Sequence, residues 1–237
     1  MVNTLNLSCV SLNNKNLKCP FKINYSSIIK SIDISQFIKQ LGIEEVEAYK
    51  DNNKRTFSIH EYIANYKHDD FDWYASNINI FKLLNLNLPY SLKSWTDYLP
   101  EEVRPEWLWL FIGPKNSYTD THIDVMNSSA WNFLLSGEKK WTFFPPNSQV
   151  SKDLLPNNFS SEYRGIPDEI HLTQYSGDII FTPSSWAHNV YNSKPTMSIT
   201  GNYINKNNIH ETLNYLNCRN DHEWYKILNY LKEEFIE

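Results

Sequence analysis

The feature that most limits how this chain can fold is a succession of short apolar runs separated by turn residues. Runs rich in aromatic and β-branched side chains occupy 107–112, 129–135, 139–144, 178–182 and 196–204. Pairs drawn from Gly, Pro and Ser interrupt them at 113–114, 136–137, 145–146 and 176–177. Short strands punctuated in this way are typical of an antiparallel barrel or jelly roll. We therefore predict a mainly β fold for the second half of the chain.

Helical periodicity flanks these strands on the N-terminal side, where an early strand is also expected. Phe37, Ile38 and Leu41 lie at helical spacing. We expect Ser35 to be the N-cap of this helix and Gly42 its C-cap.

A second N-terminal helix is expected to begin after Ser58, with Glu61 in the capping-box position. The C-terminus also returns to helix, because apolar residues recur there on one helical face. The residues of this stripe are Trp224, Ile227, Leu228, Leu231 and Phe235. The stripe can pack on its own domain, and a homodimer through this C-terminal helix is the alternative.

These features divide the chain into three parts of one compact domain. Residues 1–100 form a mixed helical N-terminal segment, residues 101–205 the β barrel, and residues 206–237 the C-terminal helices. No internal repeat and no Pro-rich or Ser-rich linker separates them.

Charge and cysteine content narrow the class of protein. The 237 residues carry 22 Lys and Arg against 27 Asp and Glu, a formal net charge of −5. DNA binding through phosphate contacts needs a clustered excess of positive charge, so we expect none. The odd set Cys9, Cys19 and Cys218 favours a reducing compartment. No run is apolar enough for a signal peptide or a membrane span, so we expect a soluble intracellular protein, cytoplasmic or nuclear.

Three residues form a candidate metal site. His122 and Asp124 have the spacing that places two side chains on one face of a strand. His188 follows a short apolar strand and a Pro-containing bend, which would place it near the mouth of the barrel. Two His and one carboxylate form a facial triad with open coordination positions, as in non-haem Fe(II) sites. The same spacing of a His two residues before an Asp recurs at 68–70. That copy lies in a charged stretch without apolar alternation, which we interpret as a solvated loop.

Lys139 indicates a bound anion near this site. It shares one strand face with Trp141 and Phe143, a face that should point into the barrel. A buried ammonium without a partner is unfavourable, so a bound anion would complete it. A lysine that extends to solvent at the hairpin is the alternative. Asn132 is likewise a polar residue in an apolar strand.

The run from Gly113 to Pro145, with Thr119, His122, Asp124, Trp131-Asn132 and Lys139 in it, continues in Gly177-Asp178, Trp186-Ala187-His188 and Thr200-Gly201-Asn202. Over about residues 100–205 this pattern resembles JmjC-domain, cupin-like oxygenases that depend on Fe(II) and 2-oxoglutarate, and most closely their small hydroxylase branch. The resemblance implies a double-stranded β-helix, the jelly-roll or cupin barrel.

The same resemblance implies roles for individual residues. His122, Asp124 and His188 would be the iron ligands and the catalytic centre. Other residues would hold 2-oxoglutarate: Lys139 with Thr119 and Thr200 at its distal carboxylate, and Asn132 and Asn202 near its metal-chelating end. Trp131, Trp141 and Trp186 are interpreted as packing residues of the barrel.

The resulting expectation is a dioxygenase that uses Fe(II), 2-oxoglutarate and O2 to hydroxylate a C–H bond, with formation of succinate. The favoured substrate is a protein or peptide side chain. Hydroxylation of a small molecule or a modified nucleoside and demethylation of N-methyl-lysine are alternatives within the same chemistry. A cupin-like binding module without catalysis is the alternative of a different class.

Overall fold

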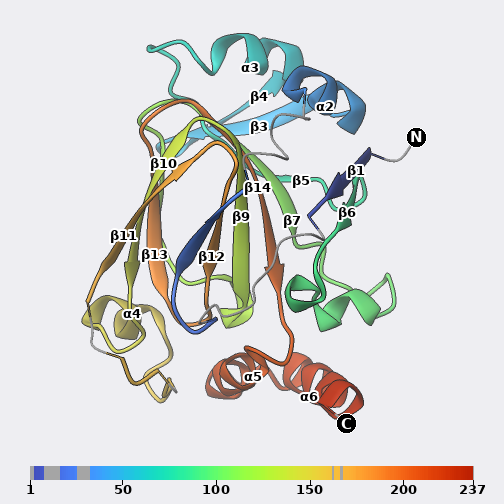
Figure 1. Cartoon of the computed structure of the whole chain (residues 1–237), viewed down its shortest axis with the longest axis vertical. Coiled ribbons are helices and arrows are strands. Elements are labelled where there is room, and N and C mark those ends of the chain that lie inside the picture. The colour runs from blue at the N-terminus through green and yellow to red at the C-terminus, as the bar shows by residue number, and fades with distance from the viewer. Residues whose placement is uncertain (1–2, 8–16, 26–32, 162, 166–167, 237) are drawn as a thin grey trace.

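The computed structural model describes residues 3–7, 17–25, 33–161, 163–165 and 168–236, and the fold within them is mainly β with helices at the periphery (Figure 1). Cys9 lies outside the described residues. Two antiparallel sheets form the centre, a six-stranded one in the order β2-β12-β9-β14-β7-β5 and a four-stranded one in the order β11-β10-β13-β8. Among the described strands no ladder joins one sheet to the other, so the jelly roll is an open pair of sheets.

All five strands expected from the apolar runs are present, with ends within one residue of the expected ones. They are β7 (Leu108–Gly113), β9 (Ser129–Ser136), β10 (Glu138–Phe144), β12 (Asp178–Thr182) and β14 (Thr196–Tyr203).

Three further strands complete the four-stranded sheet and were not expected from the hydrophobic pattern. They are β8 (Tyr118–His122), β11 (Ile170–Tyr175) and β13 (Ala187–Asn192). Their sequences are rich in Thr, Asn, His and Gln, and β8 has no fully buried residue. Strands of this composition are held by ladder pairing more than by apolar burial, which hides them from a sequence pattern.

The first hundred residues contain more strand than the sequence pattern indicates. The strands are β1 (Asn3–Asn6), β2 (Phe21–Asn24), β3 (Glu45–Lys50), β4 (Asn53–Ser58), β5 (Ala75–Asn79) and β6 (Leu84–Asn87). The helices are α2 (Ile34–Leu41) and α3 (Ile59–Asn65), with 3-10 turns η1 (Tyr90–Leu92) and η2 (Trp95–Tyr98). The β3–β4 hairpin forms a separate layer above the sheets with α2 and α3 (Figure 1).

The helix caps confirm two expectations and correct a third. The Ser58 hydroxyl accepts a hydrogen bond from the Glu61 amide at 3.1 Å, as an N-cap should. The expected N-cap Ser35 is wrong, because α2 begins two residues earlier than its apolar spacing implies. Asp33 caps it and accepts from the Gln36 amide at 3.0 Å. Gly42 ends the helix at φ 66°, as expected.

The three tryptophans interpreted as packing residues are buried. Trp131 is 1% exposed and belongs to the main core, which lies on the six-stranded sheet. Trp141 and Trp186 belong to a second cluster with Phe143 and Val190, between the two sheets. Gly201 leaves room for Trp131, since a Cβ there would lie 2.5 Å from the indole ring.

The C-terminal helices α5 (Ile209–Cys218) and α6 (His222–Ile236) pack on the end of the jelly roll (Figure 1). The apolar stripe of α6 lies in one cluster with Trp95 and Ile204. Phe235 stacks on Trp95 with ring centroids 5.5 Å apart. The stripe therefore packs on its own domain, and the homodimer stays a prediction. The remaining elements are η3 (Val125–Asn127) and α4 (Gln149–Leu154).

None of the helices in the described part of the chain has the length and apolar character needed to cross a bilayer.

The capping assignment can be tested by mutation. Replacing Asp33 with Ala removes the acceptor for the Gln36 amide and should lower the free energy of unfolding by about 1 kcal/mol in urea denaturation. Ser35→Ala is the matched control, expected to change it by less than about 0.5 kcal/mol. A larger loss in Ser35→Ala than in Asp33→Ala would contradict the assignment.

Candidate metal centre

The pairing of two strands brings the candidate metal ligands together. In the register of β13 with β8, His188 lies directly opposite His122. Their ring centroids are 4.3 Å apart. With Asp124 they form the one group of metal-ligating side chains that converges among the described residues, with ligand atoms within 4.8 Å of one another.

A β-bulge in β8 adjusts which side chains face the site. His188 pairs with His122. Two residues further along β13, Val190 pairs with Thr119, which lies three residues before His122 on β8. The extra residue in β8 lets Thr119 and His122 face the same side of the sheet despite their odd spacing. Both therefore face the inner side, with buried His188 and Val190. In a strand without the bulge, Thr119 and His122 would face opposite sides of the sheet.

Backbone carbonyls fix the tautomer of both histidines. His122 Nδ1 lies 2.8 Å from the Asp120 carbonyl oxygen, and His188 Nδ1 lies 3.1 Å from that of Trp186. A carbonyl can only accept, so each Nδ1 carries the proton and each Nε2 keeps its lone pair. This is the tautomer of a histidine that binds a metal through Nε2.

Electrostatics keep His188 neutral at physiological pH. Its side chain is 3% exposed, and burial, helped by the neighbouring His122, lowers its pKa to about 4. Trp141 and Phe143 stack on its ring at centroid distances of 5.8 and 5.7 Å. A neutral imidazole with a free Nε2 can bind a divalent cation without first losing a proton.

Asp124 lies beyond the strand rather than within it. β8 ends at His122, and Asp124, with φ −58° and ψ 153°, is the N-cap residue just before η3. It is the extended backbone between them that still brings the carboxylate beside the imidazole. Asp124 Oδ2 is buried and has no hydrogen-bond partner. A buried carboxylate oxygen is normally paired, so this atom fits a site that a cation completes.

Lys139 is buried on the inner face of β10, with 3% of its surface exposed. Its ammonium lies 5.7 Å from the centre of the Phe111 ring. No acceptor in the described part of the chain bonds to it, and burial lowers its pKa to about 7. Its surroundings therefore favour an anion that could restore the charge. The alternative of a solvent-exposed hairpin lysine is excluded.

Two residues beside Lys139 were missed by sequence reasoning. Asn192 pairs with Lys139 across β13 and β10 and is 1% exposed, with its Oδ1 unpartnered. Tyr74 lies just before β5. Burial raises the pKa of its phenol, and polar contacts with Thr119 and Asn192 partly offset this rise. Neither residue belongs to a recognisable motif, and long-range strand pairing alone brings them here.

The polar residues of the six-stranded sheet form a network that reaches across to the other sheet. The Asn132 amide group donates to Thr200 Oγ1 at 2.6 Å and to Ser198 Oγ at 3.3 Å. Its Oδ1 accepts from Gln174 Nε2, on β11, at 3.0 Å. Gln174, which belongs to no sequence motif, also accepts a hydrogen bond from the Trp141 indole at 2.9 Å.

The other predicted site residue, Asn202, is 8% exposed and donates to Ser128 Oγ at 2.9 Å. Asn132 and Asn202 are therefore hydrogen-bonded within the protein, and their contacts with a co-substrate stay predictions. His171 lies on β11 with an exposed side chain and is not part of the converging group. The second motif copy, 68–70, lies in an exposed turn, as expected.

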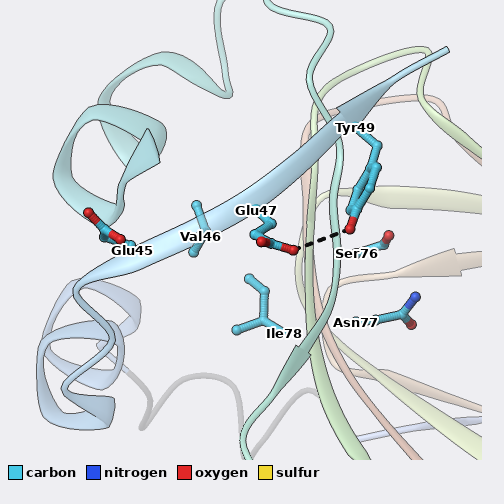
Figure 2. A pocket seen from close by; sticks show the side chains of 7 residues that line it. All are labelled: Glu45, Val46, Glu47, Tyr49, Ser76, Asn77 and Ile78. Carbon is cyan, nitrogen blue, oxygen red and sulfur yellow. Dashed lines mark hydrogen bonds between the residues drawn. The ribbon is translucent and has the colours of Figure 1, made fainter. Parts of the chain in front are cut away.

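A separate groove of about 510 Å³ lies between β3 and β5, away from these residues. Figure 2 shows its lining, including the Tyr49 hydroxyl that donates to Glu47 at 3.3 Å. None of the predicted site residues lines it.

Comparison with known proteins agrees with this geometry. Residues 109–159 match the family model described as "JmjC domain, hydroxylase". This stretch of the chain is similar to a JmjC domain. The matched region includes His122, Asp124 and Lys139, while His188 lies beyond it on β13.

Curated relatives extend the similarity on both sides of the matched JmjC segment. The chain is 26% identical to "2-oxoglutarate and iron-dependent oxygenase JMJD4" of Gallus gallus, over 70% of this chain and 45% of that protein. It is 31% identical to "Bifunctional arginine demethylase and lysyl-hydroxylase psr-1" of Caenorhabditis elegans, over 64% of this chain and 44% of that protein. "Lysine-specific demethylase JMJ21" of Arabidopsis thaliana is 34% identical over 49% of this chain and 14% of its own length. The chain thus spans less than half the length of these relatives.

The buried lysine should leave a signature in the pH dependence of stability. Because the pKa of Lys139 falls from 10.5 to about 7 on folding, the unfolded chain binds the extra proton between these pH values. The lysine therefore opposes folding most at pH 7 and below, and this effect fades towards pH 10.5.

Lys139→Met should consequently raise the free energy of unfolding, more at pH 7 than at pH 10, by an amount on the order of 1 kcal/mol or more. Urea denaturation of both proteins across this range measures it. A difference between the two proteins that does not change with pH would contradict a buried, unpaired ammonium.

Proposed function

We propose that this chain is an Fe(II)- and 2-oxoglutarate-dependent dioxygenase that hydroxylates a C–H bond on a protein or peptide side chain. The observation that carries the proposal is the pairing of an open triad with a buried cation. His122, His188 and Asp124 offer three ligand atoms, and Lys139 stands unpaired on the same inner surface.

The donor set distinguishes among metals. Two imidazoles and one carboxylate with open positions suit non-haem Fe(II), whereas structural zinc sites have four protein ligands, commonly cysteines. Cys19 and Cys218 are not part of the converging group. The three ligands would therefore hold the ion and leave room for a co-substrate and O2.

When bound, Fe(II) with 2-oxoglutarate supplies O2 activation coupled to decarboxylation, which yields succinate and CO2 and transfers one oxygen atom to the substrate. The residues of this chain position that chemistry. The Asp120 and Trp186 carbonyls hold the two imidazoles with Nε2 presented to the ion.

Lys139 would bind the distal carboxylate of 2-oxoglutarate, with the hydroxyl of Thr119 beside it and Tyr74 as a further donor. Binding of the dianion would keep the ammonium protonated, because an opposite charge offsets the burial that lowers its pKa. Thr200, Asn132 and the Gln174 network would shape the wall between this carboxylate and the metal.

Apolar rings would limit the access of water to the reacting centre. Trp141 and Phe143 stack on His188, and Trp186 lies 1% exposed at the entry to β13. Excluding water strengthens the electrostatic interactions within the site and suppresses side reactions.

A protein or peptide substrate is supported by the relatives, whose names include a lysyl-hydroxylase and demethylases of arginine and lysine. Hydroxylation of an N-methyl group followed by loss of formaldehyde gives demethylation, so the same centre serves both reactions. Product mass separates them: a gain of one oxygen atom against loss of a methyl group.

The metal assignment predicts a loss of turnover in one histidine variant but not in another. With Fe(II), 2-oxoglutarate and O2, the wild type should form succinate, and His122→Ala should reduce the rate at least about 100-fold because a ligand is lost. His171→Ala, which changes an exposed histidine on β11, should leave the rate unchanged. Equal turnover by wild type and His122→Ala would overturn the assignment.

The anion assignment predicts a matched pair of lysine variants. Lys139→Met should raise KM for 2-oxoglutarate by about tenfold or more, since a charge-assisted bond of about 1.5–3 kcal/mol is lost. Lys140→Met, on the exposed face of the same strand, should change KM by less than about twofold. Equal KM values for these two variants would place the co-substrate elsewhere.

A further inference from the structure

Two strained loops meet behind the metal ligands. Asn127 lies three residues after Asp124, and Ser185 lies three residues before His188. Both have left-handed backbones, at φ 54° and φ 70°, and Met126 before Asn127 is at φ 53°. Such φ values are unfavourable for residues other than glycine and persist only where the surroundings enforce them.

The Asn127 side chain connects the two loops. Its Oδ1 accepts from the Ser185 amide at 2.7 Å, and its Nδ2 donates to Ser185 Oγ at 3.0 Å and to the Glu211 carbonyl at 3.3 Å. Asn127 is 0% exposed and Ser185 is 1% exposed. All the hydrogen-bonding groups of this amide are therefore engaged in the protein interior, where a lost partner is costly.

On each side, one hydrogen bond to a backbone carbonyl connects this link to a metal ligand. The Asn127 amide donates to the Asp124 carbonyl at 2.9 Å and closes the turn that carries the carboxylate. Ser185 precedes Trp186, whose carbonyl accepts from His188 Nδ1 at 3.1 Å and sets the angle of the imidazole. The two loops thus control the carboxylate and the buried histidine of the triad.

We propose that Asn127 is a positioning residue that locks the loop of Asp124 to the loop of His188 and so preorganises the metal centre. This inference rests on the metal site of the proposed function. Without the Asn127 side chain, the two ligands would lose their fixed relation, and the ion would be held more weakly and in a less regular geometry.

The variant Asn127→Gly tests this directly, because glycine accepts the left-handed backbone and removes only the side-chain link. Asn220→Gly is the matched control: it changes the same residue type, at φ 57°, in the turn between α5 and α6. Co(II) is the probe, titrated into both variants and wild type by calorimetry and visible absorption, with circular dichroism to verify folding.

We expect Asn127→Gly to stay folded, to weaken Co(II) binding by about tenfold or more and to change the ligand-field spectrum of bound Co(II). Asn220→Gly should match wild type in both affinity and spectrum. Unchanged Co(II) affinity and spectrum in a folded Asn127→Gly would overturn the positioning role, whereas Co(II) binding that His122→Ala does not affect would overturn the metal site itself.

Hydrogen exchange of the metal-free wild type gives a second measurement that needs no variant. A preformed lock predicts that the Ser185 amide, bonded to Asn127 Oδ1, exchanges at least about 100-fold more slowly than an unprotected amide. Exchange at the unprotected rate would show that the lock is absent before metal binds and would overturn the proposal.

Discussion

The register of β8 against β13 is the constraint on which the candidate site depends. It sets His122 opposite His188, and the bulge next to this pair turns Thr119 to the same inner side. A shift of one residue would send the two imidazoles to opposite faces of the sheet. The buried strand β13 supports this register through its other neighbour, β10. In the β10–β13 ladder, Phe143 lies opposite His188 and Lys139 lies opposite Asn192. The metal centre and the Lys139 ammonium are thus both positioned by strands that pair with β13.

The two charged side chains of the candidate site, the Lys139 ammonium and the Asp124 carboxylate, are one positive and one negative. The chain carries a formal net charge of −5, whereas the inner surface formed by the described residues holds the Lys139 ammonium, without a counter-ion among those residues, and a triad with a single carboxylate. A divalent cation would make this interior strongly positive. A dianionic co-substrate that bound both the ion and Lys139 would balance this charge.

Much of this arrangement could be predicted from the sequence. The five apolar runs predicted strands with nearly correct ends, because β9, β12 and β14 are largely buried on both faces and β7 and β10 on one, and their composition reflects this burial. The ligand motif stood out from its copy at 68–70 by its context of strands and turns. The resemblance to JmjC oxygenases added the prediction that Lys139 and Thr119 bind the distal carboxylate of 2-oxoglutarate.

The rest depends on contacts between distant segments, which a local pattern does not contain. The strands β8, β11 and β13 are polar, so their pairing, not their composition, defines them. Gln174 and Asn192 reach the site only through this pairing, and Tyr74, just before β5, reaches it through the pairing of β5 with β7. Asn127 and Ser185 show the same limit: both look like ordinary loop residues until their left-handed backbones and shared hydrogen bonds are seen.

The most direct test of the account is equilibrium dialysis of the purified chain under anaerobic conditions with Fe(II) and 2-oxoglutarate, separately and together. The account predicts one Fe(II) per chain, and retention of one 2-oxoglutarate that is much tighter when Fe(II) is present, because ion and lysine bind opposite ends of the same molecule. Retention of 2-oxoglutarate that is equally tight with and without Fe(II), or a chain that retains no Fe(II), would contradict it.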